Sequence, residues 1–298
     1  FADPSFVPTY FVSRLARQQV TVALAGDGGD ENFAGYGKYA VDARENQLRR
    51  LFPAMVRQRM FPALGLMAGK IPHGLGRRAR SLLTSLAQDP ATAFYQSNRF
   101  CDPAVWNRII TPELQQATAG YDPADITRTH YHNADAEDHL SRILYADFKT
   151  YLPGDILVKV DRMSMANSLE TRAPLLDYRF VEFAASVPSS YKLRGAEKKY
   201  LLKKAFEGRL PNDILYRKKM GFSVPLAQWL RAELRPLGEA LLLPTESAIS
   251  EFFQPAVISA LWEEHQQGSD QFTQELWTLL AFALWLNSYS DFSSWKDL

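Results

Sequence analysis

The sequence predicts a mainly α-helical protein with one buried strand near its N-terminus. Apolar residues recur at helical spacing through most of the 298 residues after Tyr36. Residues 20–25, in contrast, form a short run of β-branched and small apolar residues that ends at a glycine, which is typical of a buried strand. With 46% hydrophobic residues, the chain can bury a core as one large domain or two smaller ones.

Taken in order, the predicted elements begin with a helix over residues 7–16 that leads into the strand. A single αβ unit is not a stable domain, because parallel strands need neighbours on both sides, so we expect upstream sequence to be missing. Residues 61–76, rich in glycine and proline, are expected to form a flexible or variable connection. Prolines and glycines separate the further predicted helices, which cover residues 40–60, 75–88, 91–98, 137–152, 155–168, 178–186, 198–207, 225–242, 254–266 and 271–289.

Charge and cysteine content exclude several functional classes. The formal net charge of +1 favours neither nucleic acid nor an anionic membrane as a partner. The single cysteine, Cys101, excludes an internal disulfide and fits a reducing, cytoplasmic compartment; without an activating neighbour it is expected to be structural. The apolar run 276–286 is too short to cross a bilayer and predicts a buried helix. His130, His132 and His139 lie in a polar stretch, where we expect them to be exposed, and match no zinc pattern.

The most informative motif is the glycine-rich, acidic turn at residues 26–31, directly after the predicted strand. Gly26, Gly28 and Gly29 allow positive φ angles and let backbone N–H groups approach a phosphate-like anion. The spacing of these glycines differs from that of the dinucleotide-binding fingerprint. A strand, a glycine turn and a helix in this order indicate a ligand site.

The acids of this turn restrict the ligand. Asp27, Asp30 and Glu31 would repel a bare anion, so a phosphate here requires a cation between it and the carboxylates. Magnesium, which binds one or two carboxylates and shares phosphate oxygens, is the natural candidate. The alternative is a tight turn whose acids only cap the following helix.

Two later segments carry further charged side chains. On the helix predicted over residues 155–168, three- and four-residue spacing places Asp155, Lys159 and Arg162 on one face beside Asp161. This face predicts a partly buried polar site, and a surface salt-bridge stripe is the alternative. In residues 168–177, an ion pair and helix capping at residue 178 explain the charges without catalysis.

A third segment, residues 194–204, begins a helix after a glycine turn with lysines in the first turn. Lysine there opposes the helix dipole, and an anionic ligand would resolve the conflict. A solvated basic face is one alternative, and a nucleic-acid patch is another, which the few interleaved aromatic residues disfavour.

Together these segments resemble glutamine-hydrolysing asparagine synthetases. The resemblance is carried by three groups of residues in matching order and spacing, and it continues weakly through Trp277 and Trp285. The groups are residues 26–31 with Phe33, Gly35 and Tyr36; residues 161–166 with Glu170, Arg172, Pro174 and Asp177; and residues 199–202 with Arg217, Lys219, Gly221, Phe222, Pro225 and Trp229.

This resemblance implies a ligase that activates aspartate or another carboxylate with ATP and forms an amide with ammonia from glutamine. It implies that Asp30 holds magnesium and pyrophosphate, and that Lys199 neutralises phosphate charge, with Lys198 as the alternative. It implies an acid/base role for Asp27, where the family usually has the longer Glu. Gly26, Gly28 and Gly29 would contact ATP and pyrophosphate, and Glu31, Asp155, Asp161 and Arg162 would lie on the substrate side.

The resemblance also implies that the chain is incomplete. The phosphate-gripping Ser-Gly-Gly-x-Asp-Ser loop and the glutaminase domain are absent from the sequence. We therefore expect one truncated synthetase domain: residues 1–45 keep about one strand of an α/β, PP-loop-type nucleotide-binding sheet, and residues 46–298 form its helical part. The isolated chain is expected to be inactive, and a homodimer is left open. Alternatives are a non-catalytic docking or nucleotide-binding module and a ligase for another acid, such as a β-lactam synthetase.

Overall fold

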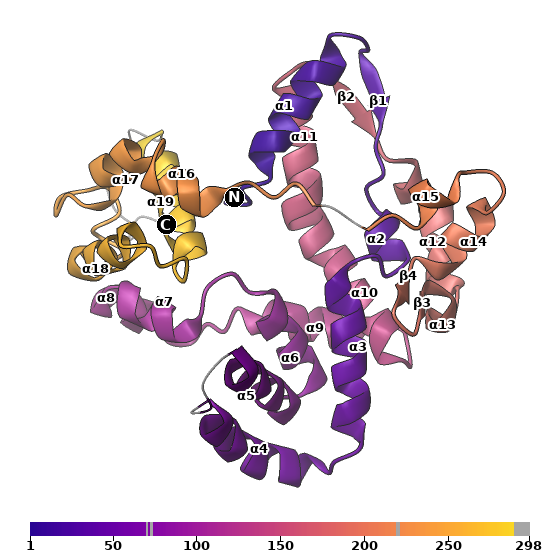
Figure 1. The fold of residues 1–298 in the computed structure, drawn as a ribbon, viewed down its shortest axis with the longest axis horizontal. Coiled ribbons are helices and arrows are strands. Elements are labelled where there is room, and N and C mark those ends of the chain that lie inside the picture. The colour runs from indigo at the N-terminus through magenta and orange to yellow at the C-terminus, as the bar shows by residue number, and fades with distance from the viewer. Residues whose placement is uncertain (70, 72–73, 219–220, 289–298) are drawn as a thin grey trace. The chain divides into compact units, whose positions relative to one another are not determined.

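The computed structural model describes residues 1–69, 71, 74–218 and 221–288. It is mainly helical with a few short strands, which confirms the predicted content, and the chain divides into two compact units (Figure 1). The first unit comprises Phe1–Thr9, Arg99–Asp122 and Gly221–Leu298, and the second comprises Tyr10–Asn98 and Pro123–Met220. The predicted site residues all belong to the second unit.

A pair of parallel strands lies at the start of the second unit. Helix α1 (Phe6–Arg17) leads to β1 (Val22–Leu24), and β1 pairs with β2 (Glu170–Arg172) with Ala23 opposite Thr171. We predicted one strand and a turn in place of β2, so the second strand is a correction. Its three residues show no alternating pattern, and only a partner from another part of the chain makes this segment a strand.

Several helices surround the core of this unit, which is built from buried side chains such as Tyr39, Phe94 and Ile143. The predicted helix 137–152 is shorter than expected: it begins at His139, where Asp138 caps it, and ends at Lys149, before a π-helical turn that follows Tyr151. The helices and the π-turn η1 are α2 (Gly29–Asn32), α3 (Gly37–Arg50), α6 (Pro90–Asn98), α9 (Ala124–Asn133), α10 (His139–Lys149), η1 (Leu152–Ile156) and α11 (Leu157–Met165).

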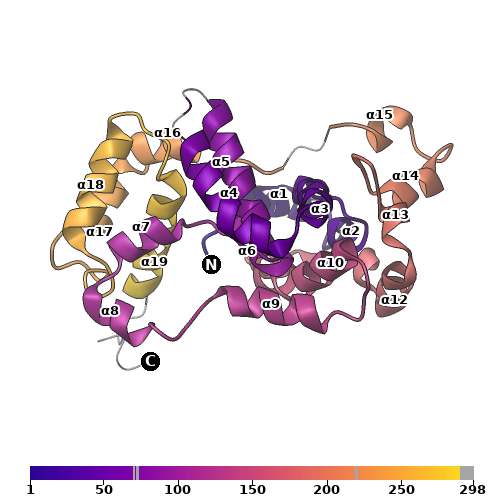
Figure 2. The ribbon, with the colours of Figure 1, turned by 90° about the horizontal axis from the view of Figure 1, so that it is seen from below.

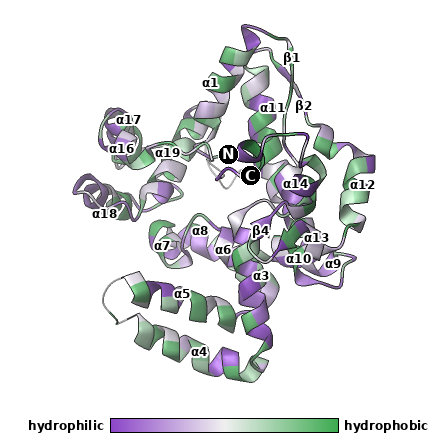
Figure 3. Ribbon diagram, turned by 45° about the vertical axis from the view of Figure 1, so that its right-hand side comes forward, coloured by the Kyte–Doolittle hydropathy of each residue, from purple (hydrophilic) through white to green (hydrophobic). Residues whose placement is uncertain are grey.

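Helices α4 (Ala54–Ala68) and α5 (Gly74–Ala87) lie side by side and form an antiparallel pair (Figure 3). The prediction of a flexible connection over residues 61–76 was wrong for most of its length, because α4 continues past Pro62. A proline inside a helix removes a backbone hydrogen bond. The helix persists here because Phe61 is buried in a small apolar cluster with residues of α5.

The remaining elements of the second unit follow β2 and lead away from the strand pair. Asp177 caps α12 as predicted, since its carboxylate accepts a hydrogen bond of 3.0 Å from the backbone N–H of Arg179. The elements are η2 (Pro174–Leu176), α12 (Tyr178–Ser186), α13 (Ser189–Lys192), β3 (Leu193–Arg194), β4 (Glu197–Lys198), α14 (Tyr200–Phe206) and α15 (Asn212–Leu215).

The first unit is a cluster of short helices (Figure 2). The predicted buried helix is confirmed as α19, whose Leu276, Leu280 and Ala283 are buried, although residue 289 lies outside the described residues. No helix among the described residues is both long and apolar enough to cross a bilayer. The helices are α7 (Pro103–Ile109), α8 (Pro112–Ala117), α16 (Leu226–Arg231), α17 (Arg235–Leu242), α18 (Pro255–Gln266) and α19 (Thr273–Asn287).

Candidate functional site

The glycine turn leaves the carboxyl end of β1 and is fixed by the segment that contains β2. The backbone N–H of Ala25 donates a hydrogen bond of 2.7 Å to the carbonyl of Arg172. The side-chain amide of Asn32 donates a bond of 2.8 Å to the carbonyl of Leu175. These two bonds hold both ends of the turn against β2 and η2, so the position of the turn depends on tertiary contacts.

Gly28 is required in this turn for two independent reasons. Its φ angle is +85°, a left-handed conformation that favours glycine. A Cβ atom at this position would also lie 2.3 Å from Cδ2 of Leu176. A larger residue would therefore change both the turn and its packing against η2.

The structure brings Asp30 and Lys199 together. Nζ of Lys199 lies 2.9 Å from Oδ1 of Asp30, and both side chains are partly exposed, by 29% and 19% respectively. The backbone of Lys199 is left-handed, with φ +53°, and its N–H donates to the carbonyl of Phe33 at 3.0 Å. This bond ties Lys199 to the residues just after α2 and directs a cation onto the acidic turn.

Gly35 is where the backbone comes closest to this ion pair. A Cβ atom on Gly35 would lie 1.9 Å from Oδ1 of Asp30 and 2.2 Å from Cε of Lys199. The backbone N–H of Gly35 also donates to the carbonyl of Asp30 at 2.8 Å. The missing side chain at this position therefore leaves the space that the ion pair occupies.

Asp27 lies on the same turn and, like Asp30, is partly buried. Burial raises the pKa of its carboxyl group, while the nearby Lys159 lowers it and the charge of Asp30 raises it further. Lys159 itself is buried on α11. Of the predicted helix face, Lys159 thus lies near the turn and Asp155 is partly buried, whereas the side chains of Asp161 and Arg162 are exposed.

Glu31 points into the interior of the unit. It is 2% exposed, and the hydroxyl group of Tyr36 donates a hydrogen bond of 2.7 Å to its Oε1. Burial raises the pKa of Glu31, and the hydrogen bond from Tyr36 opposes that rise. The buried carboxyl group acts inside the fold, below the surface that carries Asp27 and Asp30.

Comparison with known proteins shows the family of this chain. The family model for asparagine synthase matches residues 1–287. The chain belongs to the asparagine synthase family. It is similar to "Asparagine synthetase [glutamine-hydrolyzing] 1" of Bacillus subtilis (strain 168), with 31% identity over 284 residues that cover 95% of this chain and 43% of that protein.

Shorter similarities to other family members point the same way. "Asparagine synthetase [glutamine-hydrolyzing] 3" of Bacillus subtilis is 49% identical over 65 residues, which are 22% of this chain and 11% of that protein. The Gallus gallus protein named "Asparagine synthetase [glutamine-hydrolyzing]" is 38% identical over 74 residues, 24% of this chain and 13% of that protein. The chain thus spans less than half the length of these relatives.

In this member of the asparagine synthase family, the sequence did not predict a buried charged group that packs against the ring of Tyr36. Nζ of Lys38 lies 2.5 Å from a carboxylate oxygen of the buried Asp147 and 4.4 Å from the ring centre of Tyr151. The hydroxyl of Tyr39 donates to the same carboxylate at 2.6 Å. Asp147 lies on the apolar face of α10, in line with Ile143 and Leu144, and an acid at such a position indicates a buried partner.

Other groups considered for chemistry have structural surroundings. Burial raises the pKa of Cys101 to about 11, so its thiol is protonated at neutral pH, as a structural role requires. His139, expected to be exposed, is instead partly buried, with Nε2 3.2 Å from Oδ1 of Asp42. Within the described ranges, no group of three or more His, Cys, Asp or Glu residues is arranged to hold a metal ion.

The burial of Glu31 predicts that the stability of this protein depends on pH. A carboxyl group whose pKa is raised in the folded state binds its proton more tightly there than in the unfolded chain, whose Glu has an ordinary pKa of 4.5. Stability is therefore lost as the pH rises from 4.5 through the folded-state pKa. We expect the free energy of unfolding of Glu31→Gln, measured by urea denaturation, to rise relative to that of the wild type as the pH increases from 4.5 to the folded-state pKa of Glu31.

The matched control is Glu182→Gln, which removes an exposed glutamate of the same unit. We expect this variant to change the free energy of unfolding by less than about 0.5 kcal/mol, as substitutions at exposed positions usually do. A difference between Glu31→Gln and the wild type that does not change with pH would contradict the role assigned to the buried carboxyl group.

Proposed function

We propose that this chain is the ATP-handling part of an enzyme that amidates aspartate or a related carboxylate through an acyl-adenylate. The observation that carries the proposal is the ion pair between Lys199 and Asp30 beside the glycine turn. A cation held on an acidic, glycine-lined turn fits a ligand that brings both phosphate groups and a divalent ion. Family membership supports the reaction class.

In the first step of the proposed reaction, a carboxylate oxygen of the substrate attacks the α-phosphorus of ATP, and the bond to the β-phosphate oxygen breaks. Pyrophosphate leaves with the bonding electrons, so negative charge grows on the leaving oxygens. Lys199 would stabilise that charge with its ammonium group, which the left-handed backbone and the bond to Phe33 hold in place.

In the second step, ammonia attacks the acyl carbon, the bond to AMP breaks and the attacking nitrogen loses a proton. Asp27 would accept this proton. A general base works best when its pKa lies near the operating pH, and the rise caused by burial moves the pKa of Asp27 in that direction. The buried Lys159 opposes that rise, because its charge lowers the pKa of Asp27 and favours the ionised form that accepts a proton.

The acids of the turn also fit magnesium. Asp27 and Asp30 are close enough for the charge of one to raise the pKa of the other, and a divalent cation would relieve this repulsion. Asp30 would hold the ion together with the pyrophosphate group, and the bound ion would neutralise phosphate charge.

We also propose that the β1–β2 pair is part of a larger PP-loop-type sheet. Parallel sheets are normally covered on both faces, yet Val22 and Leu24 of β1 are 38% and 75% exposed. Further strands would pair with the edge of β1, and the helices that connect them would cover these side chains and bring a phosphate-binding loop to the carboxyl end of β1. A glutaminase part of the same protein would supply ammonia.

The proposal is tested by calorimetric titration of the protein with magnesium pyrophosphate. We expect Asp30→Ala to weaken binding by about 10- to 100-fold, because a charged partner of the ligand complex is lost. Asp135→Ala, which removes an exposed acid of the same unit, should bind like the wild type. Equal binding by wild type and Asp30→Ala, or no heat from either, would favour the docking module instead.

A further inference from the structure

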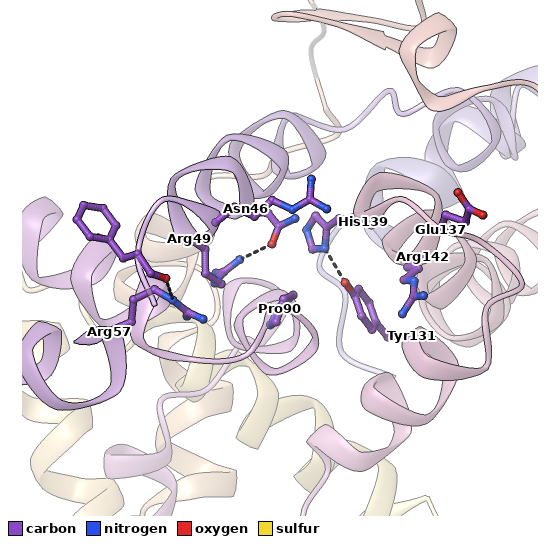
Figure 4. Close-up of a pocket in the computed structure, with 10 residues that line it drawn as sticks. Asn46, Arg49, Arg57, Pro90, Tyr131, Glu137, His139 and Arg142 are labelled. Atoms are coloured by element: carbon purple, nitrogen blue, oxygen red, sulfur yellow. Dashed lines mark hydrogen bonds between the residues drawn. The ribbon is translucent and has the colours of Figure 1, made fainter. Parts of the chain in front are cut away.

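The second unit contains a pocket that shares no residue with the glycine turn. Its volume is about 410 Å³, within the range of small-molecule sites. Figure 4 shows Arg49 and Arg57 on one side of it, Tyr131 and Arg142 on the other, and His139 and Pro90 between them. The lining residues are Asn46, Arg49, Arg50, Phe52, Arg57, Pro90, Tyr131, Glu137, His139 and Arg142.

The pocket is strongly basic. Four arginines line it: Arg49 and Arg50 from the end of α3, Arg57 from α4 and Arg142 from α10. The only acid among the lining residues is Glu137, which is exposed. Backbone contacts fix two of the cations: Arg57 donates to the carbonyl of Leu86 at 2.8 Å, and Arg142 to that of Ala136 at 2.9 Å. The guanidinium groups are therefore held in place before any ligand arrives.

Arg49 is the most unusual member of the pocket. It is only 3% exposed, and its two terminal nitrogens donate to Asn46 and to the carbonyl of Ser85, both at 3.2 Å. Its Nε atom has no hydrogen-bond partner among the described residues. A buried guanidinium N–H without a partner is costly, so Arg49 contributes a buried and incompletely paired positive charge to the lining of the pocket.

The acids behind the pocket offset its charge only in part. Asp42 and Glu45 act electrostatically on Arg49. The carboxylate of Asp42 is shared, because it also faces Nε2 of His139 at 3.2 Å. Glu45 accepts a hydrogen bond from the hydroxyl of Ser85. Arg50, Arg57 and Arg142, which are exposed or partly exposed, thus present positive charge to the pocket, and the buried Arg49 adds to it.

We infer that this pocket binds a small molecule with two or more oxyanionic charges, carried by phosphate or carboxylate groups. Planar guanidinium groups bind both kinds of oxyanion with paired hydrogen bonds. The volume exceeds that of a single inorganic ion, and the ring of Phe52, 43% exposed, offers an apolar wall for the rest of the ligand. The pocket shares no residue with the glycine turn, so its ligand would be an effector or a second substrate.

The test is calorimetric titration with pyrophosphate and, separately, with citrate at about 0.15 M salt, where general attraction between exposed charges is screened. We expect Arg50→Glu and Arg142→Gln to weaken binding of at least one anion by about 10-fold or more, the usual effect of losing a charged hydrogen bond. Pyrophosphate binding that Arg50→Glu weakens assigns the phosphate class to the pocket, and binding of citrate alone assigns the carboxylate class.

Two controls make the result decisive. Arg44→Glu reverses an exposed charge on the same helix outside the pocket and should change the affinity less than about twofold. Lys199→Ala removes the cation of the glycine turn and should leave the pocket's affinity for citrate unchanged. The inference is overturned if neither anion binds at about 10 mM, if Arg44→Glu weakens binding as strongly as Arg50→Glu, or if only Lys199→Ala weakens it.

Discussion

Lys199→Ala is expected to reduce the proposed ATP-dependent amide formation by about 100-fold or more, measured as pyrophosphate release. The ammonium group lies 2.9 Å from Asp30, and the backbone of Lys199 is tied to Phe33. Its position is therefore set before ATP binds. The ammonium group stabilises negative charge that develops in the transition state, so its loss is expected to lower mainly the rate of the chemical step.

Lys198 supplies the matched control, because it is the same residue type one position earlier in the chain. It lies at the end of β4, opposite Leu193, and only Lys199 has the left-handed backbone that precedes α14. Lys198→Ala should retain activity to within about twofold, as expected for a side chain outside the reacting groups. A loss with Lys198→Ala and none with Lys199→Ala would reverse the assignment of the two lysines.

Gly35→Ala is expected to have the second large effect, and it should change activity much more than stability. The added Cβ atom would lie 1.9 Å from Oδ1 of Asp30 and 2.2 Å from Cε of Lys199. Both atoms belong to side chains that can rotate away. We therefore expect the ion pair to open and activity to fall by about 100-fold, while the free energy of unfolding changes by only about 1 kcal/mol.

Gly37→Ala is the control, because it makes the same change two residues later. An added Cβ atom at Gly37 meets no atom within 4 Å, and Gly37 is the first residue of α3. Alanine is favoured over glycine in a helix by up to about 1 kcal/mol, so this variant should be as stable as the wild type or slightly more stable. Unchanged activity in Gly35→Ala, with the protein folded, would show that the close approach has no functional role.

Local patterns in the sequence predicted several elements of the fold. The β-branched run before the glycines predicted β1, but its expected burial was wrong, because Val22 and Leu24 are exposed. Helical spacing predicted α1, α12 and α19. The position of Asp177 before a helical segment predicted its capping bond. These features depend on neighbours in the chain, so periodicity, capping and turn preferences are sufficient to find them.

Long-range contacts explain what the sequence did not reveal. The segment that forms β2 has no strand pattern of its own and becomes a strand by pairing with β1. The continuation of α4 past Pro62 depends on the burial of Phe61 beside α5. Lys38 and Asp147 come from different helices, and neither residue alone indicates a buried pair.

The sequence by itself therefore determined the helical content, the acidic glycine turn and the family resemblance, because each depends on residue types at short spacing. The tertiary structure alone decided which charges meet: Lys199 pairs with Asp30, Lys159 lies near Asp27, and Asp161 and Arg162 are exposed. Charges interact through space, and the distance between side chains far apart in the chain is set only when the strands and helices pack.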